Sequence, residues 1–425
     1  DTSLYEELAK VSFKNAKLVA FGSTHRPGAE PGDSQGLRTL AECCAPVVAL
    51  VGKASLRQVR DVLGISSEEN LRMIRGSVEF LRKAGKEVFF DAEHLFDGYR
   101  DDAGYVLDVL KTALDAGASC IALCDTNGAT LPYDLGDITK ELASGLPEGT
   151  ALAIHCHNDS DCAVAGSLTA LRSGCSIVQG TVNGFGERCG NANICSIIPA
   201  VAMKMPGFRL SEQVKVNQLT MLSRLFYEIT VVREQPQQPY VGANAFAHKA
   251  GLHVDGVTKT TASFEQIPPE AVGNHRRILL SELSGSRTIA LKAKELGFEL
   301  DSRQAKALLA ELKRKEAEGY AFEAADASFQ LLLERSLSTK EPPFVLDGFR
   351  VIIEKRGPGE KCLSAATLKV RVNGMESEIT AAEGEGPVDA LDKCLRKTLA
   401  AFFPEVNRMR LRDFKVRIID GTVGT

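Results

Sequence analysis

The chain has 425 residues, of which 44% are hydrophobic and 25% charged, and its formal net charge is -4. This balance is typical of a globular protein with room for one large domain and a smaller one. It shows no basic stripe suited to nucleic acid and no apolar run long enough to cross a membrane.

The first half of the chain alternates apolar runs with helical patterns. The apolar runs predict six strands, at 17–22, 46–52, 87–93, 120–126, 151–157 and 177–183. Helices are predicted at 3–15, 35–44, 66–81, 101–116, 135–143, 161–173 and 191–205. Because the strands are apolar throughout, they indicate a parallel sheet that is buried on both faces.

Two α/β architectures fit this alternation, an open doubly wound sheet and a closed (β/α)8 TIM barrel. No G-x-G-x-x-G sequence follows the first strand, which argues against a dinucleotide-binding fold. Polar side chains end strand after strand, and in a barrel such ends surround one site. These residues are Ser23, Thr24, Glu93, Asp125, Thr126, His155, His157 and Asn183. We therefore expect a TIM barrel, with its first two strands upstream of Asp1.

The second half of the chain changes character. A helix is predicted at 210–232, a Pro-rich linker at 235–242, and helices at 281–296 and 302–316. Strands follow at 348–355, 365–373 and 376–381, then a helix at 387–402 and a strand from Val416. We expect a barrel domain at 1–208, helical linker subdomains at 209–340, and the start of a truncated α+β domain at 341–425.

The strongest chemical signal is the pair His155 and His157 at the end of the fifth strand. Residues i and i+2 of a strand point to the same side, so both imidazoles face one point, as two ligands of a divalent metal would. A bare H-x-H is also consistent with two ordinary loop histidines.

Two further positions are candidates for the same site. Glu93 ends the third strand, where a carboxylate suits an acid or base, although a solvated loop acid fits equally. Asn191 lies in a Gly-rich turn, 183–193, that enters a helix and could offer a carbonyl oxygen to a metal. His253 and Asp255 lie outside the six strands and by themselves indicate only a polar loop.

The runs HCHND, VNGFGERCGNAN, DAEHLFDGY, CDTNGATLP and AFAHKAGLH together resemble the metal-dependent acyl-CoA condensing enzymes. This family includes 2-isopropylmalate synthase, homocitrate synthase and citramalate synthase. The runs QPYVG, VGNHRRILLSELSG, ASFQLLLER and AAEGEGPVDALDKCLRK resemble the longer citramalate synthases within it. The resemblance spans nearly the whole chain.

The resemblance implies a barrel, a helical linker and a C-terminal regulatory domain in a domain-swapped homodimer. It also implies a divalent metal, Zn²⁺, Mn²⁺ or Mg²⁺. His155 and His157 match the metal histidines of the family, and Asn191 matches a further metal-site residue. Glu93 matches the catalytic carboxylate.

The substrates implied by the resemblance are acetyl-CoA and a short 2-oxo acid. Thr126 matches a threonine that contacts the oxo acid. His253, with a catalytic role, and Asp255, with a binding role, match linker residues that reach the acetyl-CoA site, usually from the partner subunit.

The implied activity is that of an acyltransferase that converts the acyl group to alkyl on transfer. Acetyl-CoA, pyruvate and water give (R)-citramalate and CoA, in isoleucine biosynthesis. Two alternatives stay open: a 2-isopropylmalate synthase of leucine biosynthesis, which takes 2-oxoisovalerate, and a non-catalytic paralogue. The eleven cysteines form no CxxC pair, which indicates a reducing compartment, either the cytoplasm or an organelle matrix.

The sequence departs from the family pattern at several points. The Arg-Asp pair of the family's first strand is absent, so we expect this chain by itself to hold metal poorly and to be nearly inactive. Asp161 stands where the family usually has Gly, and Phe264 stands where it often has Tyr. The segment 52–56 lacks the Trp that is common in the subgroup.

Overall fold

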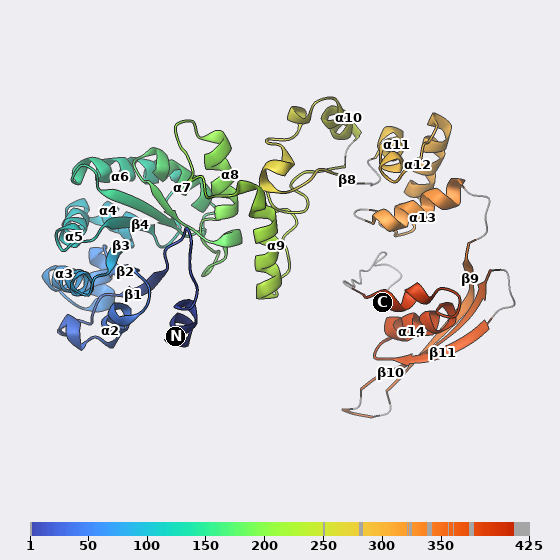
Figure 1. The fold of residues 1–425 in the computed structure, drawn as a ribbon, viewed down its shortest axis with the longest axis horizontal. Coiled ribbons are helices and arrows are strands. Elements are labelled where there is room, and N and C mark those ends of the chain that lie inside the picture. Colours follow the sequence, from blue (N-terminus) through green and yellow to red (C-terminus); the bar gives the residue numbers. More distant parts are fainter. Residues whose placement is uncertain are drawn as a thin grey trace. The chain divides into compact units, whose positions relative to one another are not determined.

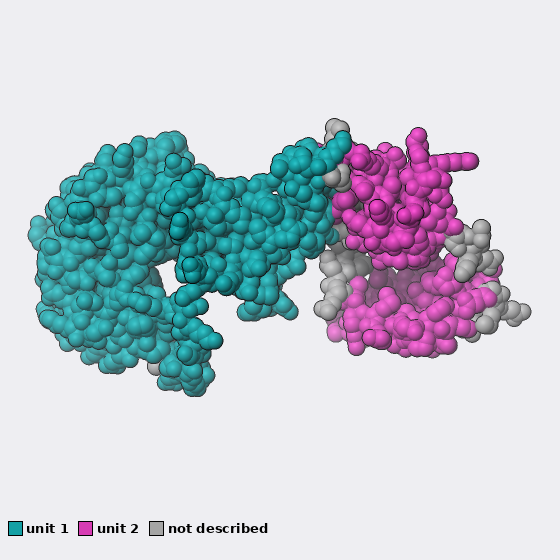
Figure 2. Space-filling view, turned by 45° about the horizontal axis from the view of Figure 1, so that its top comes forward, with its two compact units in different colours: residues 1–248, 256–277 teal, residues 249–255, 278–425 magenta. Residues whose placement is uncertain are grey.

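The computed structural model describes residues 2–249, 251–279, 284–320, 322, 325–337, 342–355, 357–359, 361–373 and 378–411. The chain divides into two compact units, which Figure 2 colours separately. Unit 1 comprises residues 1–248 and 256–277, and unit 2 comprises 249–255 and 278–425. The strand predicted from Val416 lies outside the described residues. Within the described part, no helix is both long and apolar enough to cross a bilayer.

Unit 1 is built on six parallel strands that pair in chain order. They are β1 (Val19–Ser23), β2 (Val47–Lys53), β3 (Glu87–Glu93), β4 (Cys120–Asp125), β5 (Ala151–Cys156) and β6 (Ile177–Gln179). A doubly wound sheet would reverse its strand order at a switch point, and this sheet does not. Its strands curl into part of a barrel, with α3, α5, α6 and α7 along the outer side (Figure 1). The predicted barrel-type α/β fold is confirmed.

Helices connect successive strands of the sheet. They are α2 (Gln35–Glu42), α3 (Ser67–Lys83), α4 (Leu95–Asp101), α5 (Ala103–Asp115), α6 (Pro132–Gly145), α7 (Ala163–Arg172) and α8 (Ile194–Lys204). The Ser66 side chain caps α3 by accepting a hydrogen bond from the main-chain N–H of Glu69. The inner face of α3 is buried, as the apolar spacing of Ile74, Val78 and Leu81 predicts.

Three predictions in the first half of the chain, two of helices and one of a strand, were wrong in their bounds. Helix α1 (Thr2–Leu8) ends well before residue 15. Val11 and Phe13 are 52% and 45% exposed, so a longer helix would have had no apolar face to pack. The helix predicted at 101–116 is interrupted at Asp102, whose extended backbone separates α4 from α5 and whose side chain caps α5. The strand predicted at 177–183 ends at Gln179.

The two faces of the sheet carry different side chains. Leu50, Phe90, Leu123 and Ile154 are buried in the core on the helix side. On the inner side, a smaller cluster contains Cys120, Ala122, Cys124 and Ala153. All eleven cysteines are free.

Unit 1 continues beyond the sheet with α9 (Leu219–Thr230) and a short ribbon of β7 (Ala247–His248) and β8 (Arg277–Ile278). Helix α9 is shorter than the predicted 210–232 because 3-10 turns and loops precede it. Helix α10 (Gly251–Lys259) crosses the division between the units.

Unit 2 contains a helical cluster and a small sheet. Helices α11 (Ser286–Glu295), α12 (Ser302–Ala317) and α13 (Asp326–Leu337) pack around the fully buried Phe329. Strands β9 (Phe344–Glu354), β10 (Leu363–Val372) and β11 (Glu378–Gly384) form an antiparallel sheet in the order β11-β10-β9. Helix α14 (Pro387–Leu399) packs mainly on β10 and β11. The described residues thus show one complete β–β–β–α unit.

Candidate active site

The two histidines of the H-x-H motif lie together at the carboxyl end of β5. Their ring centroids are 5.2 Å apart. His155 belongs to the strand, and His157 follows it, with its main-chain N–H donating to the carbonyl of Asp125. His157 also forms an isolated antiparallel bridge with Asn191.

Asn191 completes this group. Its Nδ2 lies 3.1 Å from Nε2 of His155, and the residue is 9% exposed. The turn before it packs so tightly that a Cβ atom on Gly190, whose φ is +90°, would stand 2.0 Å from the carbonyl oxygen of Gly184. The structure therefore brings together the three predicted metal-site residues, His155, His157 and Asn191.

The chemistry of the three side chains fits a divalent metal. Burial, followed by the nearby His155 and Arg188, lowers the pKa of His157 and favours the neutral imidazole that metals bind. Nδ1 of His157 is buried and has no hydrogen-bond partner among the described residues. The described residues contain no group of three His, Cys, Asp or Glu that could hold a metal. The polar side chain that lies beside the two histidines is the carboxamide of Asn191.

Two side chains, Gln179 and Asp91, continue the hydrogen bonding from Nδ1 of His155. Gln179 Oε1 lies 2.9 Å from His155 Nδ1, and Gln179 Nε2 donates to Asp91 Oδ1 at 3.0 Å. Asp91 is 5% exposed. Burial raises the pKa of this carboxyl, and the hydrogen bond from Gln179 and the charge of His155 oppose that rise.

Glu93 ends β3 at the same edge of the sheet and is paired with a lysine. The register sets it beside Lys53, the last residue of β2, and Lys53 Nζ lies 2.5 Å from Glu93 Oε2. The two side chains are 20% and 26% exposed. A carboxylate in this position is accessible to a reactant and is held by a neighbouring charge.

Thr126 joins the ends of neighbouring strands. Its hydroxyl accepts a hydrogen bond from the main-chain N–H of His94 at 2.8 Å. Its carbonyl accepts one from Arg188 at 2.7 Å. Arg188 also forms a two-pronged ion pair with Asp159, at 2.7 and 2.9 Å. These bonds tie the loops after β3, β4 and β5 to the Gly-rich turn.

Asp161, which replaces a usual glycine, has a φ of 56°. This is the left-handed region that favours glycine and, among other residues, tolerates Asn and Asp. Asn158 donates to its carboxylate at 3.2 Å. The departure from the family pattern is thus accommodated in the same backbone conformation that explains the usual glycine.

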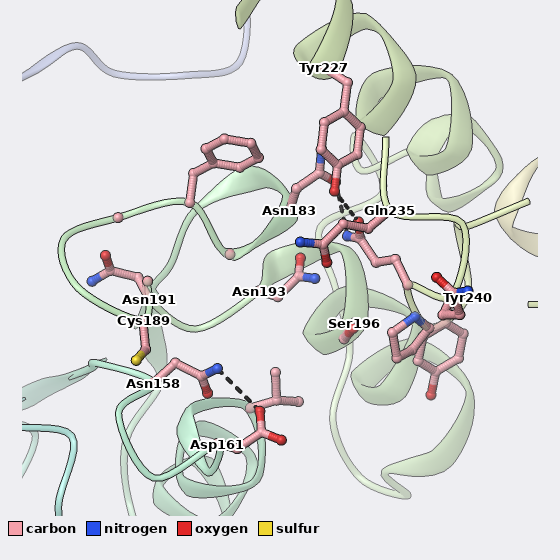
Figure 3. Close-up of a pocket in the computed structure, with 18 of the residues that line it drawn as sticks. Asn158, Asp161, Asn183, Cys189, Asn191, Asn193, Ser196, Tyr227, Gln235 and Tyr240 are labelled. Carbon is pink, nitrogen blue, oxygen red and sulfur yellow. Dashed lines mark hydrogen bonds between the residues drawn. The ribbon is translucent and has the colours of Figure 1, made fainter. Parts of the chain in front are cut away.

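A cavity of about 780 Å³ lies beside the Gly-rich turn (Figure 3). Its walls carry Asn158, Asp161, Asn193 and Gln235. Asn183 does not join the histidines: its side chain accepts from Gln238 and donates to the carbonyl of Ser223 in α9. Tyr227 of α9 donates to the same Gln238 at 2.7 Å.

The two predicted linker residues lie in α10 and belong to unit 2. The Asp255 carboxylate forms an ion pair with Arg287, and His253 is exposed. Phe264, at the position often held by Tyr, is 48% exposed. The roles assigned to His253 and Asp255 stay predictions.

The sequence motifs do not identify four further residues of this region, Asp91, Gln179, Lys53 and Arg188. The strand pattern could have indicated two of them, because it places Asp91 and Gln179 on the same face of the sheet as the site residues. Asp91 precedes Glu93 by two residues, and Gln179 pairs in register with His155. Lys53 and Arg188 carried no such signal, because their partners come from other segments.

Comparison with known proteins places these features in a family. The HMGL-like family matches residues 31–226, the homocitrate synthase post-HMGL domain-like family matches 240–319, and the LeuA allosteric (dimerisation) domain matches 323–425. The chain is 45% identical to an (R)-citramalate synthase of Geobacter sulfurreducens, across 100% of this chain and 80% of that protein. It is 44% identical to one of Aquifex aeolicus, with the same coverage.

More distant relatives include a 2-isopropylmalate synthase of Heliobacterium modesticaldum, which is 30% identical over 87% of this chain and 76% of that protein. Among solved structures, an HMG-CoA lyase of Bacillus subtilis is 20% identical, covers 53% of this chain and 75% of its own, and has a TM-score of 0.45.

Proposed function

The chain belongs to the (R)-citramalate synthase family of HMGL-like proteins, and from this premise we propose that it condenses acetyl-CoA with pyruvate. Acetyl-CoA, pyruvate and water would give (R)-citramalate and CoA. A carbon–carbon bond forms between the acetyl methyl and the keto carbon, and water cleaves the thioester. The observation that carries this proposal is the cluster of His155, His157 and Asn191 at the carboxyl ends of a barrel-type sheet.

His155, His157 and Asn191 are the residues that would hold a divalent metal, for which Zn²⁺, Mn²⁺ and Mg²⁺ are candidates. When bound, such an ion supplies Lewis acidity toward a keto oxygen. Nitrogen and carboxamide donors suit these ions, and the lowered pKa of His157 supports its role as a neutral ligand.

Glu93 is the proposed base that removes a proton from the acetyl methyl. Its position at a strand end and its partial exposure support this role. Thr126 is the proposed contact for the oxo acid, because its hydroxyl lies between the ends of β3 and β4. His253 and Asp255 are proposed to serve the acetyl-CoA site.

We further propose a homodimer, because residues 323–425 match a dimerisation domain. The free thiols suit a reducing compartment, and we propose the cytoplasm.

The test is release of CoA thiol from acetyl-CoA by protein made from its full reading frame. Pyruvate and 2-oxoisovalerate are compared, with and without Mn²⁺. We expect metal-dependent turnover that prefers pyruvate and is lost in His157→Ala and Glu93→Gln. The exposed residues His275 and Glu148 provide matched controls, so His275→Ala and Glu148→Gln should retain wild-type turnover.

Two other outcomes of this assay would contradict the proposed activity. A preference for 2-oxoisovalerate would assign the chain to 2-isopropylmalate synthesis. No turnover with any short 2-oxo acid, in folded and metal-loaded protein, would overturn the enzymatic proposal and leave a non-catalytic paralogue.

A further inference from the structure

The inner face of the sheet carries a chain of hydrogen-bonded polar side chains that begins at Asp91 and ends at His155, two strands away. Asp91 lies on β3, Gln179 on β6 and His155 on β5. The contacts are 3.0 Å from Gln179 Nε2 to Asp91 Oδ1 and 2.9 Å from Gln179 Oε1 to His155 Nδ1. Strands β4 and β5 lie between Asp91 and Gln179 in the sheet, so this is a contact across the hollow of the curled sheet.

Small residues make that contact feasible. Asp91 pairs in register with Ala122, and Ala122 pairs with Ala153. Both alanines are fully buried on the inner face. Because neither fills the space above it with a long side chain, the Gln179 carboxamide can reach across to Asp91.

The hydrogen bonds of this polar chain all donate in one direction, from His155 through Gln179 to Asp91. A carboxylate only accepts hydrogen bonds, so Asp91 must face the NH2 group of Gln179. The carbonyl oxygen of Gln179 is then turned toward His155. A carbonyl oxygen only accepts, so His155 must carry its proton on Nδ1, which leaves Nε2 with a free lone pair. That nitrogen is the one that faces Asn191, at 3.1 Å.

We propose that Asp91 and Gln179 are positioning residues that fix the tautomer of His155, so that Nε2 is the nitrogen presented to the metal. The inference rests on the proposed function in one respect, the presence of a metal. Neither residue touches the reactants. Their effect is to select one of two tautomers and one ring orientation before the ion arrives.

A purely structural role predicts a different pattern. A buried polar network can stabilise a fold without setting a tautomer, and its loss then lowers stability alone. The position of the His155 proton in metal-free protein separates the two, because it depends on the network and on neither metal nor activity.

The first experiment is therefore NMR on ¹⁵N-histidine-labelled, metal-free protein, with the His155 signal assigned by comparison with His155→Ala. We expect the Nδ1–H tautomer in the wild type. Asp91→Asn allows the Gln179 carboxamide to take either orientation, so both tautomers should appear. Protonation of Nε2 in the wild type would overturn the proposal.

The second experiment is Mn²⁺ affinity by calorimetry, with thermal unfolding in parallel. Gln179→Leu should weaken binding about tenfold to a hundredfold, the range for partners of metal-bound histidines. Asp91→Asn should weaken it less. Gln179→Leu protein that is folded and binds Mn²⁺ as the wild type does would also overturn the proposal.

Glu265→Gln is the matched control. Glu265 is likewise a buried carboxylate, and it accepts from Arg276 rather than from a residue of the hydrogen-bonded chain to His155. It should lose stability while its Mn²⁺ affinity stays within about threefold. An equal loss of affinity in this control would show a general effect of altering a buried carboxylate. Failure of turnover with an intact His155 tautomer would count against the proposed function and leave this inference standing.

Discussion

Gly186 lies so close to Asn191 that a Cβ atom on it would stand 1.8 Å from Asn191 Oδ1. No side chain can be added there without moving the carboxamide. We expect Gly186→Ala to weaken Mn²⁺ binding by at least about tenfold, because a misplaced donor loses its coordination. Calorimetric titration of metal-free protein measures this directly.

The control for this substitution is Gly36→Ala in α2. At Gly36 the nearest atom to an added Cβ is Ser34 Oγ, 3.8 Å away, which is ordinary contact. Alanine in a helix is favoured over glycine by about 1 kcal/mol, so this variant should be slightly more stable and bind metal normally. Normal Mn²⁺ affinity in folded Gly186→Ala would show that Asn191 is not needed for binding.

Asp161 supplies a prediction about backbone conformation. With φ at 56°, glycine relieves the strain but adds flexibility to the unfolded chain, and these effects nearly cancel. We expect Asp161→Gly to change the free energy of unfolding by about 0.5 kcal/mol or less. Asp161→Ala should cost about 1 kcal/mol, because alanine tolerates this region poorly. If the charge of Asp161 mattered instead of its backbone conformation, both variants would change the free energy of unfolding equally. Urea denaturation of the two variants distinguishes these explanations.

The sequence was sufficient to predict the order of the strands and the barrel-type fold. Apolar runs such as 120–125 are long enough and uniform enough to mark buried strands, and the alternation with helices leaves little choice of topology. Helix ends were harder to predict. The break at Asp102 depends on one side chain that caps α5, and a periodic pattern does not show that choice.

The same limit applies to the candidate site. His155 and His157 are neighbours in sequence, so spacing alone predicted that they meet. The ion pair of Arg188 with Asp159 joins two loops 29 residues apart, and the bond from Gln179 to Asp91 joins strands 88 residues apart. Contacts of this kind depend on how the sheet curls, which the local pattern does not encode.

Glu265 makes one contribution to the pH dependence of stability in unit 1. Its carboxylate is 2% exposed and accepts two bonds from Arg276, both at 2.6 Å. His248 Nε2 lies 3.2 Å from the same carboxylate. The bonds from Arg276, and then that of His248, lower the pKa of Glu265 below its ordinary 4.5. The unfolded chain therefore binds this proton at higher pH, so the stabilisation is complete above about pH 4.5 and is lost as pH falls through the folded value.

We expect Glu265→Gln to lower the free energy of unfolding by about 2 kcal/mol at pH 7, because it leaves the Arg276 charge without its partner. The difference from wild type should shrink below pH 4.5, since protonation removes the same charge. Urea unfolding at pH 7 and pH 4 measures both values. Exposed Glu148→Gln should change neither, and a difference that grows on acidification would contradict the sign argued here.

Lys53 provides the last prediction, because it holds the proposed catalytic carboxylate. Lys53 and Glu93 lie opposite each other at the ends of β2 and β3, and Lys53 Nζ is 2.5 Å from Glu93 Oε2. Lys53→Met keeps most of the side-chain stem but removes the charge that orients Glu93. We expect kcat to fall about tenfold to a hundredfold, the effect of a displaced reacting group, while Mn²⁺ affinity is unchanged. Lys17 pairs with Glu87 at the other end of β3, so Lys17→Met is the matched control and should keep its kcat. Wild-type turnover in Lys53→Met would mean that Glu93 is positioned without this ion pair, whereas an equal loss in Lys17→Met would trace the effect to the strand rather than to the site.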